Sequence, residues 1–184
     1  MRINILLSII GFLFLFGSMQ LYAQDEHPHS EEHHFQHHRI AVFTGYGLIA
    51  GAINEDGNQQ VKVIPVFGFD YEYFINHKFG LGLFNDIELS SYSVEDDHQE
   101  YLERNYAFVT SLVFLYEPLI GWSLFAGPGY EFEKHHSFPV IKVGTELVKN
   151  FNHGWSMGVA ASYEFKEINS SLNIGLTAGK KLGK

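Results

Sequence analysis

The sequence predicts an all-β protein, specifically an eight-stranded antiparallel up-and-down transmembrane β-barrel. Three observations lead to this prediction: apolar residues alternate with small or polar ones in eight segments, short connections alternate with longer ones, and aromatic residues gather at both ends of the apolar faces. The composition agrees, because the chain contains 18 glycines and 16% aromatic residues. Helical periodicity is missing after the first segment.

That first segment has the pattern of a secretory signal peptide. Arg2 precedes an apolar run over residues 5–16, and small and polar residues follow it. The run is shorter than the roughly 20 apolar residues that a membrane-spanning helix needs. We therefore expect residues 1–23 to be removed on export, with Gln24 as the first residue of the mature chain.

Charge and cysteine content narrow the classes of partner. The chain has 12 basic and 21 acidic residues, a formal net charge of −9, and no cysteine. Loss of Arg2 with the signal peptide makes the mature chain more acidic still. Proteins that bind nucleic acid usually carry a basic patch, so we expect no nucleic-acid partner. Disulfides are excluded.

Residues 24–39 form a polar, histidine-rich segment. Its six histidines are His27, His29, His33, His34, His37 and His38, and four acidic residues are interleaved with them. Imidazole nitrogens bind Zn, Cu and Ni, and nearby carboxylates can add ligands or accept the second ring N–H. The segment fits equally well a flexible tract that captures divalent metal and a solvated tail with no metal function. No cofactor is required by either hypothesis.

The predicted barrel covers residues 40–184. Its eight strands are expected at residues 40–50, 60–75, 79–92, 104–117, 122–133, 138–149, 155–166 and 170–182. In the seventh strand, Trp155, Val159 and Phe165 share one face, whereas Ser162 and Glu164 share the other. The connections at 76–78, 118–121 and 150–154 are short, and those at 51–59 and 93–103 are longer and polar. Each strand therefore has one apolar face and one small or polar face.

Alternation alone does not separate a membrane barrel from a soluble, lipocalin-like carrier, which turns its apolar face inward around an apolar ligand. The aromatic positions favour the membrane, because aromatic belts form at both bilayer interfaces. One belt is expected at Tyr73, Tyr116, Trp122 and Trp155, and the other at Tyr92, Tyr106, Tyr130, Phe132, Tyr163 and Phe165. The lipocalin-like carrier is kept as an alternative.

The same parity predicts a charged interior. Asp86, Glu88, Glu131, Glu133 and Glu164 are expected inside together with Lys62, Lys142 and Lys166, whereas Asp70, Glu72 and Glu117 are expected near the mouth at the termini, where water can reach them. Side chains fill an eight-stranded barrel, so no open pore is expected. A structural ion-pair network is favoured over a cation site made by the surplus carboxylates.

This architecture, from Ile40 to the C-terminus and with the preceding signal peptide, resembles the small outer-membrane β-barrel proteins of the OmpA/OmpX type. The resemblance implies a monomer in the outer membrane of a Gram-negative envelope, with lipid as its partner and the N-terminal tail in the periplasm. The resemblance bears on fold and location more than on activity, and we expect a binding or envelope-structural role.

Some small outer-membrane barrels modify lipids, so an enzyme is a further alternative. The only catalytic grouping that the sequence offers at the loop side is His136 and Ser137 with Glu133 or Glu167, and the Gly-x-Ser-x-Gly pattern is missing. We therefore predict a protein that is not an enzyme and that captures divalent metal through its histidine-rich tail.

Overall fold

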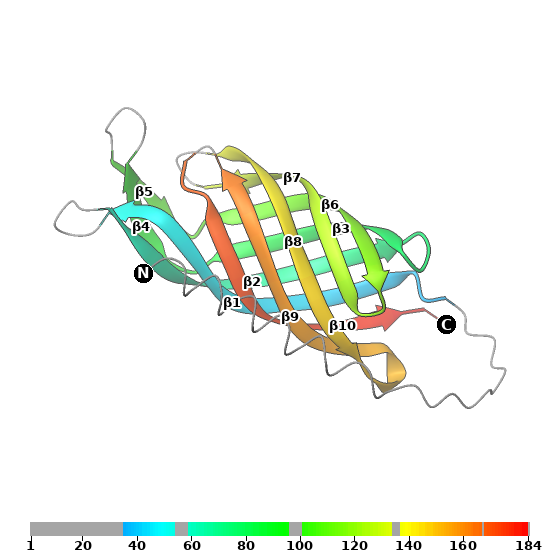
Figure 1. Cartoon of the computed structure of the whole chain (residues 1–184). Coiled ribbons are helices and arrows are strands. Elements are labelled where there is room, and N and C mark those ends of the chain that lie inside the picture. The colour runs from blue at the N-terminus through cyan, green and yellow to red at the C-terminus, as the bar shows by residue number, and fades with distance from the viewer. Residues whose placement is uncertain (1–34, 54–58, 96–100, 134–136, 167, 184) are drawn as a thin grey trace, which may run out of the picture. The chain divides into compact units, whose positions relative to one another are not determined.

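The computed structural model of this chain describes residues 35–53, 59–95, 101–133, 137–166 and 168–183. Within them, ten strands follow one another (Figure 1). They are β1 (His38–Ile53), β2 (Gln59–Phe74), β3 (Phe79–Glu88), β4 (Ser91–Glu95), β5 (Tyr101–Asn105), β6 (Phe108–Leu119), β7 (Trp122–Phe132), β8 (Phe138–Asn150), β9 (Trp155–Lys166) and β10 (Ser171–Leu182). A short 3-10 turn, η2 (Asn152–Gly154), joins β8 to β9. None of the described residues forms a helix long and apolar enough to cross a membrane. The predicted signal peptide lies outside the described residues.

Eight of these strands close into an antiparallel up-and-down barrel, which confirms the predicted fold class. Around the wall the order is β1, β2, β3, β6, β7, β8, β9 and β10, and β10 pairs with β1 from His38↔Leu182 to Ile49↔Ser171. Closure gives every strand of the wall two neighbours and satisfies its backbone groups, as a membrane interior requires. We call the end with the short β2–β3, β6–β7 and β8–β9 connections the turn end, and the opposite end the loop end.

Local chemistry makes the turn-end connections tight. The Asn76 side-chain oxygen accepts hydrogen bonds from the backbone N–H groups of Lys78 (2.8 Å) and Phe79 (3.0 Å), which closes the β2–β3 turn. In the β6–β7 turn, Gly121 has a φ of 79° and donates its N–H to Glu117 Oε1 at 2.6 Å. A left-handed backbone favours glycine, so the residue types at these two turns set the hairpin geometry.

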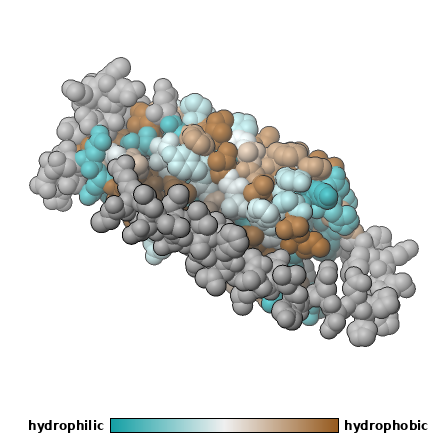
Figure 2. All heavy atoms as spheres, viewed as in Figure 1, coloured by the Kyte–Doolittle hydropathy of each residue, from teal (hydrophilic) through white to brown (hydrophobic). Residues whose placement is uncertain are grey.

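The outer wall is apolar and the interior is small, aromatic or charged. Leu83 and Val159, in the middle of their strands, are each 45% exposed, whereas Ser156 and Glu164 on the opposite face are each 1% exposed. Figure 2 shows apolar residues along the visible barrel wall. A soluble barrel would place these faces the other way round, so the distribution is that of a membrane-spanning barrel.

Aromatic side chains mark both ends of this apolar wall, as predicted. The exposed aromatic residues include Tyr73, Phe79, Tyr116 and Trp155 at the turn end, and Tyr106, Phe108, Tyr130, Phe132 and Phe165 at the loop end. One predicted member of the loop-end belt is wrong. Tyr92 is only 5% exposed and donates a hydrogen bond to Glu88 Oε2 at 2.8 Å, so its ring lies inside.

Two apolar clusters fill the interior beside the charged residues. Phe74, Phe84, Val113, Leu115 and Phe125 form one, with Phe35 packed against it from the N-terminal side. Phe43, Ile49, Ala52, Ile64, Val66, Tyr92 and Val94 form the other. Gly144 makes room for this filling, because a Cβ there would collide with the ring of Phe125. Gly144 is the register partner of Phe125 on the adjacent strand, so this large interior ring depends on a glycine beside it in the wall.

The largest departure from the predicted fold lies at the loop end. Residues 79–92 do not form one strand, because β3 ends at Glu88, and residues 93–103 are not simply a loop, because β4 and β5 form a hairpin. That hairpin pairs with β1 through Ala52↔Val94 and Ile53↔Ser93. Since β2 occupies the other edge of β1, the hairpin takes the edge that β10 leaves free beyond Ile49.

This pairing carries the chain across the mouth of the barrel. β3 lies beyond β2, whereas β4 lies on the far side of β1, so the connection from Glu88 to Ser91 must pass over the inner face of β2. Leu89 still continues the β2–β3 ladder, because its N–H donates to Pro65 O at 2.8 Å, and Ser90 O accepts from Tyr106 N at 3.2 Å. The contact that marks the crossing is that of Lys62 Nζ on β2 with Ser91 O at 2.8 Å. The β4–β5 hairpin therefore lies as a cover on the loop end, with Tyr92 and Val94 in the core beneath it.

We expect a charged residue on the outer face of the barrel, in the middle of a strand, to destabilise the protein. Leu83→Arg or Val159→Arg should lower the free energy of unfolding by about 2–4 kcal/mol, because an arginine there meets hydrocarbon. Urea unfolding in lipid vesicles measures this change. Ile120→Arg serves as the matched control, because Ile120 lies in the β6–β7 turn and is 86% exposed. Equal effects at all three positions would contradict the assignment of the wall to the membrane.

Candidate functional site

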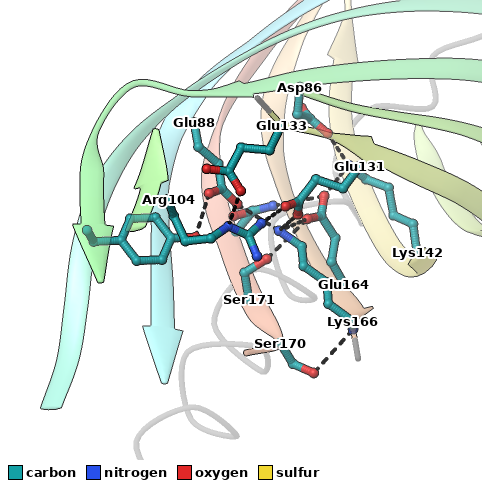
Figure 3. Close-up of polar contacts among 12 residues, drawn as sticks. Asp86, Glu88, Arg104, Glu131, Glu133, Lys142, Glu164, Lys166, Ser170 and Ser171 are labelled. Carbon is teal, nitrogen blue, oxygen red and sulfur yellow. Dashed lines mark hydrogen bonds and ion pairs between the residues drawn. The ribbon is translucent and has the colours of Figure 1, made fainter. Parts of the chain in front are cut away.

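Charged side chains in the interior form two separate clusters. The loop-end cluster comprises Asp86, Glu88, Arg104, Glu131, Glu133, Lys142, Glu164 and Lys166 (Figure 3). The turn-end cluster comprises Arg39, Glu72, Glu146 and Ser156. The alternation of each strand sends these side chains inward, and the narrow barrel brings distant strands within reach of one another.

Lys166 is the centre of the loop-end cluster. From β9 its ammonium group reaches Glu88 on β3 at 2.7 Å, Glu131 on β7 at 2.7 Å and Glu164 at 3.1 Å. Lys142 on β8 pairs with Asp86, also on β3, and with Glu164 at 3.0 Å. These links join β3 to strands on the other side of the barrel. The expected structural ion-pair network is therefore present.

Hydroxyl and amide groups of β10 complete the surroundings of Glu164. Ser171 Oγ donates to Glu164 Oε2 at 3.1 Å, and Asn173 Nδ2 donates to Glu164 Oε1 at 3.3 Å. Both donors are buried with the carboxylate they serve. A buried charge is tolerated when its remaining lone pairs are hydrogen-bonded, so these neutral groups stabilise the ionised cluster.

Arg104 ties the β4–β5 hairpin to the barrel wall, and the sequence did not identify it as an interior residue. Its Nε lies 2.9 Å from Glu133 Oε2, it also pairs with Glu131, and its guanidinium stands 5.2 Å from the centroid of the Phe138 ring. Glu133 additionally accepts a hydrogen bond from Asn105 N at 2.8 Å. The side chain of Arg104 is 2% exposed, so this latch is excluded from solvent.

The turn-end cluster is organised by Arg39. Its guanidinium forms a fork with Glu146, at 2.8 Å to each carboxylate oxygen, and donates to Glu72 at 2.6 Å and to Ser156 Oγ at 3.3 Å. The expectation that Glu72 is hydrated near the mouth is wrong, because Glu72 is buried in this cluster. Arg39, assigned by sequence to the tail, lies inside β1. Its parity with Ala41 and Phe43 is the signal that places it inward.

Carboxylates outnumber cations in the described interior. The carboxylates are Asp70, Glu72, Asp86, Glu88, Glu131, Glu133, Glu146 and Glu164, and the cations are Arg39, Arg104, Lys142 and Lys166. Lys62, predicted to join them, instead binds Ser91 O and lies 5.9 Å from the centroid of the Tyr92 ring. Each interior cation therefore serves more than one carboxylate.

Asp70 differs from the other interior carboxylates of the described chain. It is buried, also contrary to the expectation of hydration, and its Oδ1 accepts no hydrogen bond from the described residues. It borders a cavity of about 20 Å³ between the two clusters, together with Asp86, Lys142, Glu146, Ser162 and Thr177. Such a volume holds roughly one water molecule. It is far too small for the apolar ligand of a lipocalin-like carrier.

The histidine-rich segment is only partly described. His27, His29, His33 and His34 lie outside the described residues. His37 Nδ1 bonds the carbonyl of Phe74 at 2.7 Å, and Phe74 N donates to His37 O at 2.7 Å. His38 opens β1, and its Nδ1 lies 2.7 Å from the Tyr71 hydroxyl. In the part of the chain that the structure describes, no three His, Asp or Glu residues are grouped to hold a metal ion.

Two elements of the candidate catalytic grouping, His136 and Glu167, also lie outside the described residues. Ser137 is described and exposed. Glu133 is already engaged by Arg104 and by the backbone N–H of Asn105. It is therefore not free to orient a catalytic base.

The chain was compared with known proteins. No protein-family model matches the sequence, and no curated protein matches it. Among solved structures, Ail of Yersinia pestis, in complex with the heparin analogue sucrose octasulfate, is 14% identical with a TM-score of 0.49, covering 79% of this chain and 99% of Ail. The outer membrane protein OprG of Pseudomonas aeruginosa is 13% identical with a TM-score of 0.47, covering 80% and 98%. The N-terminal β-barrel domain of OprF from P. aeruginosa is 11% identical with a TM-score of 0.42, covering 77% and 96%.

Removing Lys142 should destabilise the barrel. Lys142→Met leaves Asp86 and Glu164 without one of their cations, and breaking a buried pair in this way costs about 3–5 kcal/mol. Chemical unfolding in detergent micelles measures the loss. The double change Lys142→Met with Asp86→Asn should recover part of it, because a neutral amide no longer needs the ammonium. A double variant no more stable than the single one would show that the pairing is unimportant.

We expect Arg104 to stabilise the β4–β5 hairpin more than the barrel wall. Arg104→Gln weakens the bonds to Glu131 and Glu133, so hydrogen exchange of the β4–β5 amides should accelerate more than that of β7 to β10. Mass spectrometry of exchanged peptides resolves the two regions. Lys78→Gln is the control and should leave the β4–β5 exchange unchanged, because Lys78 is exposed in the β2–β3 turn at the opposite end of the barrel. Uniform acceleration throughout the barrel would contradict a local latch.

Proposed function

We propose that this chain is an outer-membrane β-barrel protein without enzymatic activity, with a binding or envelope-structural role carried by its two ends. The observation that supports this most is the interior filled by ion pairs beneath an apolar outer wall. A filled lumen is a poor conduit for solutes, and side chains fill barrels of this size. Any binding partner would therefore contact the loop end or the turn end of the barrel.

The membrane assignment joins two independent features. The sequence begins with the pattern of an export signal, and the barrel turns large apolar side chains outward. Exported proteins of Gram-negative cells that expose such a wall fit the outer membrane, with short turns on the periplasmic side. Because the N-terminal segment enters the barrel at the turn end, the histidine-rich tail would lie in the periplasm.

We assign to this tail the capture of Zn, Cu or Ni through His27, His29, His33, His34, His37 and His38. His37 offers a specific reason in favour. A carbonyl only accepts hydrogen bonds, so the bond to Phe74 O requires a proton on Nδ1. When the ring is neutral, its Nε2 then carries the lone pair that a metal needs. His37 is thus oriented as an anchored ligand at the base of the tract.

The test begins with the membrane fraction of cells that express the full chain. The mature protein should require detergent for extraction; recovery in soluble form, folded without detergent, would favour the lipocalin-like carrier.

Calorimetry with Zn, Cu or Ni on the extracted protein should give micromolar or tighter binding. Binding should weaken between about pH 7.5 and about pH 5.5, because protons compete for imidazole nitrogen.

The deletion that tests the tail must stop before the barrel. Deleting residues 25–34 removes four histidines but keeps Phe35 and His37, which contact the turn end. Metal affinity should fall strongly while the barrel stays folded. A matched chain of the same length, with those four histidines replaced by Gln, controls for loss of length. Undiminished affinity in both variants would place metal binding elsewhere.

A further inference from the structure

We propose that Lys149, Trp155 and Lys180 form a binding site for the phosphate group of an anionic phospholipid in the leaflet at the turn end. We call these three residues the Lys–Trp rim. The inference rests on the membrane placement proposed above and goes beyond it, because it assigns a lipid class and a position on the wall.

The rim is a continuous group on three adjacent strands. Lys180 on β10 pairs in register with Trp155 on β9, and Lys149 on β8 pairs with Met157, so it lies diagonally across from Trp155. The Lys180 ammonium stands 5.0 Å from the centroid of the Trp155 ring. Trp155 is half exposed on the outward face, and both lysines are exposed. Trp155 therefore lies on the strand between the two lysines, and the Lys180 ammonium stands over its ring.

The depth of the rim matches a lipid headgroup. Trp155 belongs to the aromatic belt of the turn end, and such belts lie at the membrane–water interface. Lysines near the end of a spanning strand extend their aliphatic stems along the wall and place the ammonium among the headgroups. The phosphate layer of the leaflet therefore lies within reach of both lysines.

Neither ammonium group has an anionic partner on the described protein surface. The described carboxylates of the same strands and of β2 turn into the lumen and are buried there: they are Glu146, Glu164, Asp70 and Glu72. Glu117 at the end of β6 also lies near β8, but its carboxylate accepts the N–H of Gly121 at 2.6 Å. The other titratable groups described near this rim include His153 in the η2 turn, Lys181, and His38, which bonds the Tyr71 hydroxyl. The outward side of the rim therefore holds uncompensated positive charge beside aromatic rings.

The outward-facing lysines of the turn end lie on β8 and β10 and are not spread around the barrel, which distinguishes a local site from a continuous basic band. At the turn end of β3, β6 and β7, the outward positions hold aromatic and aliphatic residues such as Phe79, Tyr116 and Leu124. The described lysines elsewhere at this end do not join the lipid-facing surface in the same way. Lys78 lies in the β2–β3 turn, and the Lys181 ammonium lies 5.7 Å from the centroid of the interior Phe74 ring.

The chemistry favours an anionic over a zwitterionic lipid. Each lysine near an anionic membrane surface gains electrostatic attraction, and two lysines together correspond to a preference of up to about thirtyfold. A headgroup without an amine, such as that of phosphatidylglycerol, keeps its phosphate charge uncompensated and can accept both ammonium groups. In phosphatidylcholine, the trimethylammonium group opposes the same lysines.

Trp155 itself can report the bound lipid. The chain has only two tryptophans, so Trp122→Phe leaves Trp155 as the single tryptophan, which can be excited selectively beyond the absorption of tyrosine. In phosphatidylcholine vesicles, brominated phosphatidylglycerol should quench Trp155 at a several-fold lower mole fraction than brominated phosphatidylcholine. In the Lys149→Gln and Lys180→Gln double variant, the two lipids should quench nearly equally. Lys78→Gln is the matched control and should keep the preference.

Three outcomes would overturn the proposal. Equal quenching by both lipids with the rim intact would exclude selectivity, and an undiminished preference in the double glutamine variant would exclude these lysines. The double variant Lys149→Arg with Lys180→Arg retains the charge and must retain the preference, which covers the case in which the glutamine variant fails to fold. No quenching by either lipid would contradict the membrane placement itself, so the two failures are distinguishable.

Discussion

The pairing of charge inside a narrow barrel is the constraint on which the rest of this structure depends. Ionised groups removed from water are tolerated only when they are paired and hydrogen-bonded. Four cations accomplish this for most of the interior carboxylates by bridging strands that are not neighbours in the wall, as Lys166 does between β9 and β3. The network therefore links opposite sides of the barrel as well as pairing most of its buried carboxylates, so a substitution that displaces one cation affects several strands.

The filled interior determines where function can reside. Among the described residues, the lumen is occupied by ion pairs and phenyl rings, and the cavity beside Asp70 holds about one water molecule, which leaves little room for a ligand there. The two ends are built differently. At the loop end, the β4–β5 hairpin lies over the mouth and is held by Arg104. At the turn end, Phe35 packs against the aromatic cluster and His37 bonds the end of β2.

These turn-end contacts change how the histidine-rich segment is viewed. His37 and His38 are anchored to the barrel through Phe74 and Tyr71, rather than belonging wholly to a free tail. A metal ion bound there would have His37 as a ligand held by the barrel and the preceding histidines of the segment as further ligands. The lipid-facing lysines on the neighbouring strands add a second surface at the same end, with different chemistry. Metal and phosphate recognition would then lie on the periplasmic side, and the hairpin cover on the other.

Sequence periodicity alone determined most residues of the wall and the face that each of them takes, with the exception of residues 89–92 and 104–107. The alternation of β9 places Trp155 and Val159 outward and Glu164 inward without knowledge of any partner, because successive side chains of a strand point to opposite faces. The interior positions of Asp86, Glu131 and Lys142 followed from the same rule. So did the expectation of a structural ion-pair network, since charges inside so narrow a barrel must be paired.

Only the tertiary structure decided which partners these residues meet. Alternation makes β4 a strand, but its pairing with β1 depends on the edge that β10 leaves free, so Tyr92 turned out to be a core residue instead of a belt residue. Arg39 and Arg104 stand at the ends of predicted segments, where local pattern is weakest, and both became buried bridges. Pairing between distant strands is a property of the closed cross-section, which no local stretch of sequence contains.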